Sequence, residues 1–145
     1  MQGQRVAAAG RPGPISEADI RRLVESFYAE VRRDAELAPI FEAAIGPDWG
    51  PHLDLLCDFW SGVVRMSGRY KGKPLQVHRA LPDLAPAHFR RWLALFRETA
   101  ARTQNPAAAV LFVQRAERIA TTLQQGVFGP RANVPDEEET RPCNG

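Results

Sequence analysis

The chain has 145 residues, the usual length of a single domain. Hydrophobic residues make up 44% of it and charged residues 25%, so it can bury a core beneath an ordinary polar surface. No apolar run approaches the roughly 18 residues that a membrane span needs. The net charge is +2, without the basic stripe that nucleic-acid binding requires. We therefore expect neither a membrane nor a nucleic acid as a partner.

The two ends of the chain differ in composition from its middle. Residues 1–14 are rich in Ala, Gly and Pro and lack the apolar core of a secretory signal, and residues 129–145 are polar and acidic. We expect both to be disordered tails that flank one domain at 15–128. Cys57 lies in an apolar helical pattern and Cys143 in the acidic tail, so we expect two free thiols and a cytoplasmic protein.

Helical spacing predominates between the tails, because β-branched residues are sparse and strict alternation of apolar and polar residues never persists. Ser16 and Asp19 give the first helix a capping-box-like start, and Pro51 is a good first residue for a later helix. In chain order we expect helices at about 16–34, 51–66, 75–81, 87–103 and 106–127, with a short turn at 36–41 after the first. The predicted fold is a compact all-α domain.

Tyr28, His52 and Trp92 lie on the apolar faces of their predicted helices. Taken singly, each favours an ordinary role: a tyrosine at the edge of the core, an exposed or capping histidine, and an indole that fills space. The alternative is that they surround a ligand, since a buried indole N–H needs an acceptor and a bound ligand could be one.

His78 lies between Leu75 and Leu81 on a predicted helix of barely two turns, bracketed by Pro74 and Pro82. A helix this short is weak on propensity alone. It would be held better if one of its side chains were bound to something. Taken alone, however, the position of His78 leaves an ordinary structural role open.

The residue types that bind metal ions argue against a structural zinc site. The three histidines lie far apart, Cys57 has no nearby cysteine, and neither an EF-hand loop nor a phosphate-binding glycine loop is present. No Ser–His–Asp arrangement stands out for nucleophilic catalysis. Two histidines on apolar faces, together with several aromatic residues, suit a large flat apolar cofactor instead, and haem is one. These aromatic residues are Phe41, Phe59, Phe89 and Trp92.

Several motifs follow one another in a specific order between Ile20 and about Gly126. They are Phe27-Tyr28 with Val31-Arg32, Leu37-Ala38-Pro39-Ile40-Phe41, Trp49 with His52, Asp58-Phe59-Trp60, Tyr70-Lys71-Gly72-Lys73-Pro74, Leu75 with His78 and Leu81, and the runs 88–96 and 114–120. Together they resemble the truncated haemoglobins, a short form of the globin fold. The chain has no Gly-Gly pair, and this favours the third group of that family.

The resemblance implies a two-over-two helical sandwich around haem b, with His78 as the proximal ligand of the iron. It implies that Tyr28, His52 and Trp92 face the distal side, where O2, NO or CO would bind. The residues expected to contact the macrocycle are Phe41, Leu56, Phe59, Leu75, Leu81, Phe89 and Trp92. The candidates for contacts with the propionates, chosen only because they lie nearby in the sequence, are Arg65, Tyr70, Lys73 and Arg79.

His88 is the competitor of His78 for the iron. It lies four residues before Trp92, so both could share a face, yet Phe89 continues the apolar stripe of that helix better. His88 also follows Pro86 in a first turn, where it is expected to be exposed. We therefore predict that His78 is the ligand.

Two hydrogen-bond donors beside a bound gas predict slow release, which suits chemistry or scavenging better than oxygen transport. The resulting prediction is reversible binding of O2 or another diatomic gas at ferrous iron. One alternative is a haem enzyme for NO dioxygenation or peroxide reduction, which would need an external reductase because the sequence shows no flavin or reductase domain. Another is a helical interaction module without a cofactor, in which the same residues are simply core.

Overall fold

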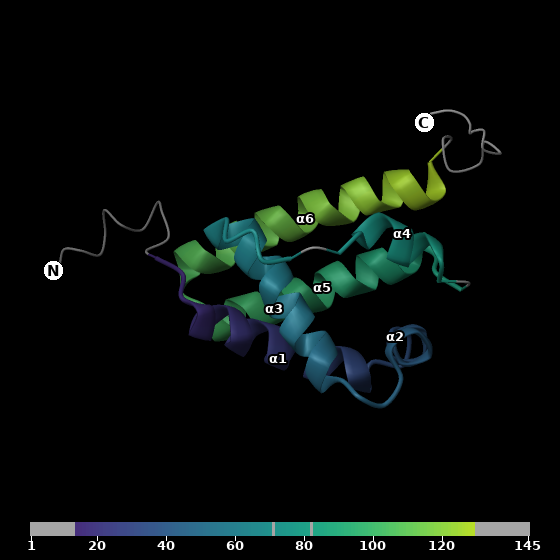
Figure 1. Cartoon of the computed structure of the whole chain (residues 1–145), viewed down its shortest axis with the longest axis horizontal. Coiled ribbons are helices and arrows are strands. Elements are labelled where there is room, and N and C mark those ends of the chain that lie inside the picture. Colours follow the sequence, from purple (N-terminus) through teal and green to yellow (C-terminus); the bar gives the residue numbers. More distant parts are fainter. Residues whose placement is uncertain (1–13, 71, 82, 130–145) are drawn as a thin grey trace, which may run out of the picture.

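The computed structural model describes residues 14–70, 72–81 and 83–129, so the two expected tails lie outside the described residues apart from positions 14 and 129. The described chain forms six helices and no strand (Figure 1). They are α1 (Glu17–Arg33), α2 (Ala38–Ile45), α3 (Gly50–Arg65), α4 (Pro74–Arg79), α5 (Pro86–Thr103) and α6 (Pro106–Phe128). The all-α fold class predicted from the sequence is confirmed.

Helix α1 begins with the capping box that its sequence predicts. The Ser16 hydroxyl accepts a hydrogen bond from the backbone N–H of Asp19 at 3.0 Å, and the Asp19 carboxylate accepts one from the backbone N–H of Ser16 at 3.0 Å. Two orphan donors of the first turn are thereby satisfied. The helix buries Tyr28 together with an apolar stripe of Ile20, Leu23, Val24, Phe27 and Val31.

Residues 36–41, expected as a short turn, are instead the approach to and first half of helix α2. Pro39 in the first turn of this helix has a backbone preset for it, and the alanines that follow favour helix. Gly46, with a φ of 80°, ends the helix in a conformation that other residues rarely adopt. No residue of α2 is fully buried, so the sequence offers no clear apolar stripe by which to recognise it.

The remaining helices begin and end within two residues of their predicted positions. Five of the six described helices carry a proline at their first or second residue, where the missing N–H has no helical partner to lose. No helix of the described chain is long and apolar enough to cross a membrane.

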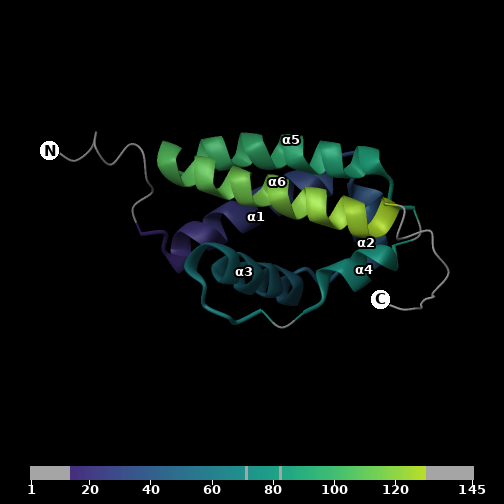
Figure 2. The ribbon, with the colours of Figure 1, turned by 90° about the horizontal axis from the view of Figure 1, so that it is seen from above.

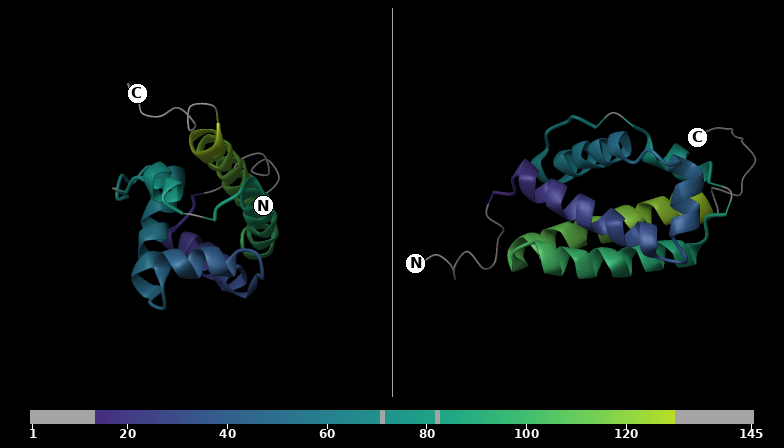
Figure 3. Two further views of the ribbon diagram at one scale, coloured as in Figure 1. Left: turned by 90° about the vertical axis from the view of Figure 1, so that its right-hand side faces the viewer. Right: turned by 90° about the horizontal axis from the view of Figure 1, so that it is seen from below.

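The helices form two packed pairs. Helices α5 and α6 lie side by side and antiparallel along one side of the molecule (Figure 2). Helix α1 packs against both α5 and α3, and α3 also contacts α6. In Figure 3, α3 and the α5–α6 pair lie on two sides of the molecule, with α1 running between them at one edge. The short helix α4 packs against α6.

Aromatic rings fill the core where α1, α3 and α5 meet. The indole of Trp60 stacks on Phe96 with ring centroids 5.1 Å apart, and Phe96 stacks on Trp92 at 5.3 Å. Phe27 meets Phe96 edge to face at 5.1 Å. Contacts of this geometry add about 0.5–1.5 kcal/mol each beyond the area that they bury. This cluster fixes α5, and with it Trp92, against α1.

Candidate ligand-binding site

A cavity of about 190 Å³, partly open to solvent, lies among the helices, and all six contribute residues to it. Its lining is almost entirely apolar, and the polar groups on it are few. All three histidines of the chain are among them, although they lie far apart in the sequence. Such a cavity suits a large apolar ligand that is fixed by a small number of polar contacts.

The structure brings together most residues that the sequence predicted for this site. Those that line the cavity are Tyr28, Phe41, His52, Leu56, Phe59, His78, Leu81, Phe89 and Trp92. Leu75 does not line it, in contrast to the expectation. Leu75 turns instead toward α6, where its methyl groups approach Gly126 and where it packs with the cluster of Phe89, Ala120 and Leu123.

The cavity also explains why part of the apolar side of α3 is not buried. Leu55 is apolar, yet it is 44% exposed. It lines the cavity together with Leu56 and Phe59, so this side of α3 faces the cavity and not packed core. The residues of α3 that are fully buried are Cys57, Trp60 and Ser61.

His78 has one ring nitrogen fixed by the backbone of its own helix. Its Nδ1 lies 2.6 Å from the carbonyl oxygen of Pro74, one turn earlier in α4. A carbonyl oxygen only accepts hydrogen bonds, so Nδ1 must carry the proton and donate it. Nε2 of the neutral ring is then left with a free lone pair. This is the arrangement by which proteins orient a metal-binding imidazole.

His88 shows the opposite arrangement. Its Nδ1 accepts a hydrogen bond of 2.9 Å from the backbone N–H of Ala85, which caps the start of α5. Because Nδ1 accepts here, the proton of the neutral ring is on Nε2. That nitrogen has no lone pair to offer a metal ion while the cap is in place. Both histidines line the cavity, and the hydrogen bonds therefore separate a competent metal ligand from a structural cap.

Tyr28 and Trp92 are the hydrogen-bond donors on another wall of the cavity. Tyr28 is 4% exposed. Burial raises the pKa of its phenol to about 12, and a hydrogen-bonding contact with Trp92 opposes part of that rise. The hydroxyl is thus protonated throughout the neutral range. It is able to donate a hydrogen bond into the cavity.

His52 is held beside these donors by aromatic packing. Its ring meets Tyr28 edge to face at 6.4 Å and Trp49 at 5.7 Å between centroids. Burial lowers the pKa of His52, so the neutral ring is favoured. Trp49 is buried as well, stacks on Phe41 at 6.3 Å, and carries the guanidinium of Arg32 over its ring at 4.9 Å.

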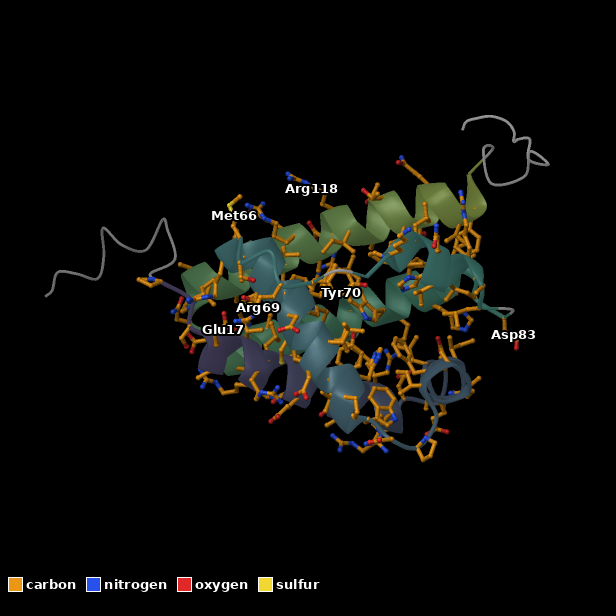
Figure 4. All side chains as sticks on the ribbon, in the orientation of Figure 1. Glu17, Met66, Arg69, Tyr70, Asp83 and Arg118 are labelled. Atoms are coloured by element: carbon orange, nitrogen blue, oxygen red, sulfur yellow. The ribbon has the colours of Figure 1, made fainter. Side chains whose placement is uncertain are left out.

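The sequence offered four candidates for contacts with the haem propionates. Of these, Tyr70 lines the cavity and packs edge to face on Phe59 at 5.1 Å. Figure 4 shows Tyr70 over the middle of the molecule, while Glu17 and Arg69 meet near the start of α1. Arg65 lies at that end too, paired with Glu17 at 2.9 Å. Arg79 donates to the carbonyl oxygen of Gly126 at 3.0 and 3.1 Å, and Lys73 is exposed. Arg65 and Arg79 are therefore held by these partners and do not line the cavity.

Sequence reasoning missed the contribution of α6 to the cavity and, apart from Phe41, that of α2. Ile40, Ala44 and Ile45 line it from α2, and Ile119, Ala120 and Leu123 line it from α6. The apolar spacing of α6 was read as core packing. A helix face that lines a cavity has the same spacing as one that packs on its neighbour, so periodicity does not distinguish them.

Within the described residues, no three His, Cys, Asp or Glu side chains gather into a group that could hold a metal ion by themselves. A metal in this cavity would thus need most of its ligands from a cofactor. An imidazole with a free Nε2, such as that of His78, is a ligand of the kind that haem iron takes from protein. The residues present fit a haem group on this ground.

No model of a known protein family matches the chain. The chain is 36% identical over 117 residues to the group 3 truncated haemoglobin ctb of Campylobacter jejuni, covering 79% of this chain and 92% of that protein. Its structure matches the crystal structure of group III truncated haemoglobin from Campylobacter jejuni with a TM-score of 0.77 and 35% sequence identity. That match covers 81% of this chain and 95% of the other.

The fold is therefore that of a globin. At this level of identity and coverage, the chain belongs to the group 3 truncated haemoglobins. The resemblance noted in the sequence is confirmed, and membership of this family implies a haem cofactor.

Proposed function

We propose that the chain binds haem b through Nε2 of His78 and binds O2 or another diatomic gas reversibly at the ferrous iron. The observation that carries this proposal is the 2.6 Å contact between Nδ1 of His78 and the Pro74 carbonyl, because it leaves Nε2 free and aimed from a fixed ring. The proposal accounts for a short helix with no side-chain cap and no fully buried residue.

The apolar lining of the cavity would hold the macrocycle. Phe41, Leu56, Phe59, Leu81 and Phe89 would offer flat or branched apolar surface to it. When bound, haem would supply an iron atom that takes O2, NO or CO.

Tyr28 and Trp92 would set how long the gas stays. The neutral phenol of the buried Tyr28 and the indole N–H of the half-buried Trp92 are donors on the wall of an apolar cavity. A buried hydrogen bond of this kind contributes about 1–3 kcal/mol, and about 1.4 kcal/mol is a tenfold change in an equilibrium constant. Two such bonds slow release by orders of magnitude. This favours scavenging or chemistry over oxygen transport.

The same two donors favour a second candidate function, a haem enzyme for NO dioxygenation or peroxide reduction. Donors beside the gas stabilise negative charge as it develops there, and both reactions build up such charge. Electrons would come from an external reductase. The test is turnover: with a reductant present, steady consumption of NO or peroxide supports the enzyme, and binding without turnover supports the gas-binding protein.

The proposal as a whole is tested by adding hemin to the purified full-length chain and recording ferric, ferrous and CO absorption spectra. We expect an intense Soret band that persists on dialysis and shifts on reduction and on addition of CO. A folded chain that stays colourless after hemin is added contradicts the proposal, and it supports an interaction module without a cofactor.

A further inference from the structure

Asp34 is a buried carboxylate that the proposed function does not use. It follows the last residue of α1, and its side chain is 6% exposed. Nε of Arg91 donates a hydrogen bond to its Oδ1 at 2.7 Å, and a terminal nitrogen of Arg91 forms an ion pair with the same oxygen at 2.7 Å. Its Oδ2 accepts hydrogen bonds from the backbone N–H groups of Glu36 and Leu37 at 3.1 and 3.0 Å. Both carboxylate oxygens are thus occupied. We call these three hydrogen bonds and the ion pair the Asp34–Arg91 clasp.

The clasp lies at the base of α2, which has few other anchors. The residue before this helix, Leu37, offers no side-chain cap, so Asp34 satisfies N–H groups at its start. Helix α2 has eight residues, none of them fully buried, and its main packing partner among the described helices is α1. A helix this short depends on tertiary contacts for its position. Two contacts from outside α1 help to hold it: the ring of Phe41 stacks on Trp49, and through the clasp Arg91 of α5 binds the segment that leads into α2.

Helix α2 forms a wall of the ligand cavity, because Ile40, Phe41, Ala44 and Ile45 all line it. Arg91 reaches the clasp from α5 and directly precedes Trp92 in the sequence. The clasp therefore ties the α2 wall to the helix that carries one of the two hydrogen-bond donors. Neither Asp34 nor Arg91 lines the cavity itself.

From this geometry we infer that Asp34 and Arg91 are positioning residues that hold α2 against the cavity and so limit how fast a gas reaches it. The part of the inference that concerns gas access rests on the proposed function. The part that concerns the position of α2 is independent of the proposed function and can be measured without haem. When the clasp is broken, α2 keeps its attachment to α1 through the chain and its ring contact on Trp49, but it opens more often. The chain then exposes the cavity without losing its fold.

The experiment compares full-length Arg91→Gln and Asp34→Asn variants with the unmodified chain. Hydrogen exchange of backbone amides is followed by NMR, first without hemin and then with it. We expect exchange in residues 38–45 to become at least tenfold faster in both variants, while amides in the middle of α6 keep their rates. After hemin is bound, CO association following flash photolysis should become several-fold faster, and CO dissociation should stay unchanged.

A matched control is Glu117→Gln, which breaks an exposed pair of 2.8 Å between α6 and Arg97 of the same helix as Arg91. We expect this variant to leave the exchange of α2 and the association of CO unchanged. If Arg91→Gln fails to fold, Arg91→Lys keeps the charge without the two-nitrogen contact, and a smaller acceleration of α2 exchange is expected.

If exchange in α2 is equally fast with the clasp intact and with it broken, the inference is overturned, since the clasp then does not hold α2 in place. Faster exchange with unchanged CO association also overturns it, because the wall then does not limit gas access. If hemin does not bind but exchange in α2 accelerates, the proposed function fails while the role of the clasp in placing α2 stands.

Discussion

The two sides of the cavity hold their polar side chains in different ways. On the side of α4 and the start of α5, ring nitrogens of His78 and His88 are fixed by hydrogen bonds to backbone groups three or four residues away. On the side of α1 and α3, Tyr28 and His52 are held by ring packing, with no hydrogen bond from the His52 ring to another described residue. Backbone hydrogen bonds determine which nitrogen carries a proton, whereas ring packing determines only where a side chain lies.

This difference teaches how each side should respond to substitution. A fixed tautomer is either present or lost, so a substitution at His78 should abolish haem binding and not merely weaken it. Donors held by packing are individually replaceable, so changes at Tyr28 should be graded. His52 has the most freedom of the three, because nothing in the described structure fixes either of its ring nitrogens.

The largest effect is expected from His78→Ala. Removing the imidazole with the free Nε2 should abolish specific haem binding, seen as loss or scrambling of the Soret band after dialysis. His88→Ala is the matched control from the same cavity, and we expect it to keep the haem spectrum because its Nε2 carries a proton in the capped state. A normal spectrum in His78→Ala together with a lost one in His88→Ala would reverse the assignment.

Tyr28→Phe should have the next largest effect, on the release of O2. Phenylalanine keeps the ring contacts with Phe27 and Phe41, at 4.7 and 5.7 Å, and removes only the hydroxyl. Losing a buried donor worth about 1–3 kcal/mol should speed O2 dissociation by roughly 5- to 150-fold. Stopped-flow displacement of O2 by CO measures this rate.

Tyr70→Phe is the control for that measurement, since Tyr70 also lines the cavity but lies in the loop before α4. We expect its O2 dissociation rate to stay within twofold of the unmodified chain. If Tyr28→Phe leaves the rate unchanged, Tyr28 is not the donor, and the position of Trp92 makes it the remaining candidate.

The sequence predicted the long helices well because each has an apolar stripe or a clear start signal. The capping box at Ser16 and the prolines at helix starts are local features, and the structure contains them where they were expected. Helix α2 was not predicted, because it has no apolar stripe that packs into the core: none of its residues is fully buried. Local signals predict where helices begin, but a helix held by its neighbours leaves little trace in its own sequence.

The candidate site was predictable in its members and not in its chemistry. The apolar patterns made Tyr28, His52, His78 and Trp92 candidates, the family resemblance implied that they share one site, and the structure brings them to one cavity. Which nitrogen of His78 or His88 is free depends on the backbone conformation around Pro74 and Ala85, which no side-chain pattern encodes. The Asp34–Arg91 clasp joins residues 57 positions apart, and a solvent-exposed arginine gives no sign of such a partner.

The pH dependence of stability tests how His52 is held on the side of the cavity formed by α1 and α3. Burial lowers its pKa below the ordinary value of 6.5, so the unfolded chain binds a proton at this position more readily than the folded chain does. The free energy of unfolding should therefore fall as the pH drops below about 6.5, and replacing His52 by Gln should make that fall shallower. An NMR titration of the His52 ring in the folded chain gives the pKa directly. A value at or above 6.5 would contradict this explanation.

The smallest effect is expected where α4 meets α6, and it tests whether the fixed ring of His78 depends on the packing of its helix. A Cβ at Gly126 would lie 2.5 Å from a methyl carbon of Leu75, so Gly126→Ala must displace that side chain. Alanine in a helix interior gains about 1 kcal/mol over glycine. The displacement opposes this gain, so we expect the free energy of unfolding to change by less than about 1 kcal/mol in urea titrations.

The same substitution in a Leu75→Ala background should recover the full gain of about 1 kcal/mol, because the obstructing methyl groups are gone. Both chains should keep the haem spectrum of the unmodified protein. The hydrogen bond from His78 to Pro74 lies within α4, so it moves with that helix when the helix is displaced from α6. If Gly126→Ala alone weakens haem binding as strongly as a change at His78 does, the ring is positioned by the contact between helices and the backbone hydrogen bond is not sufficient to fix it.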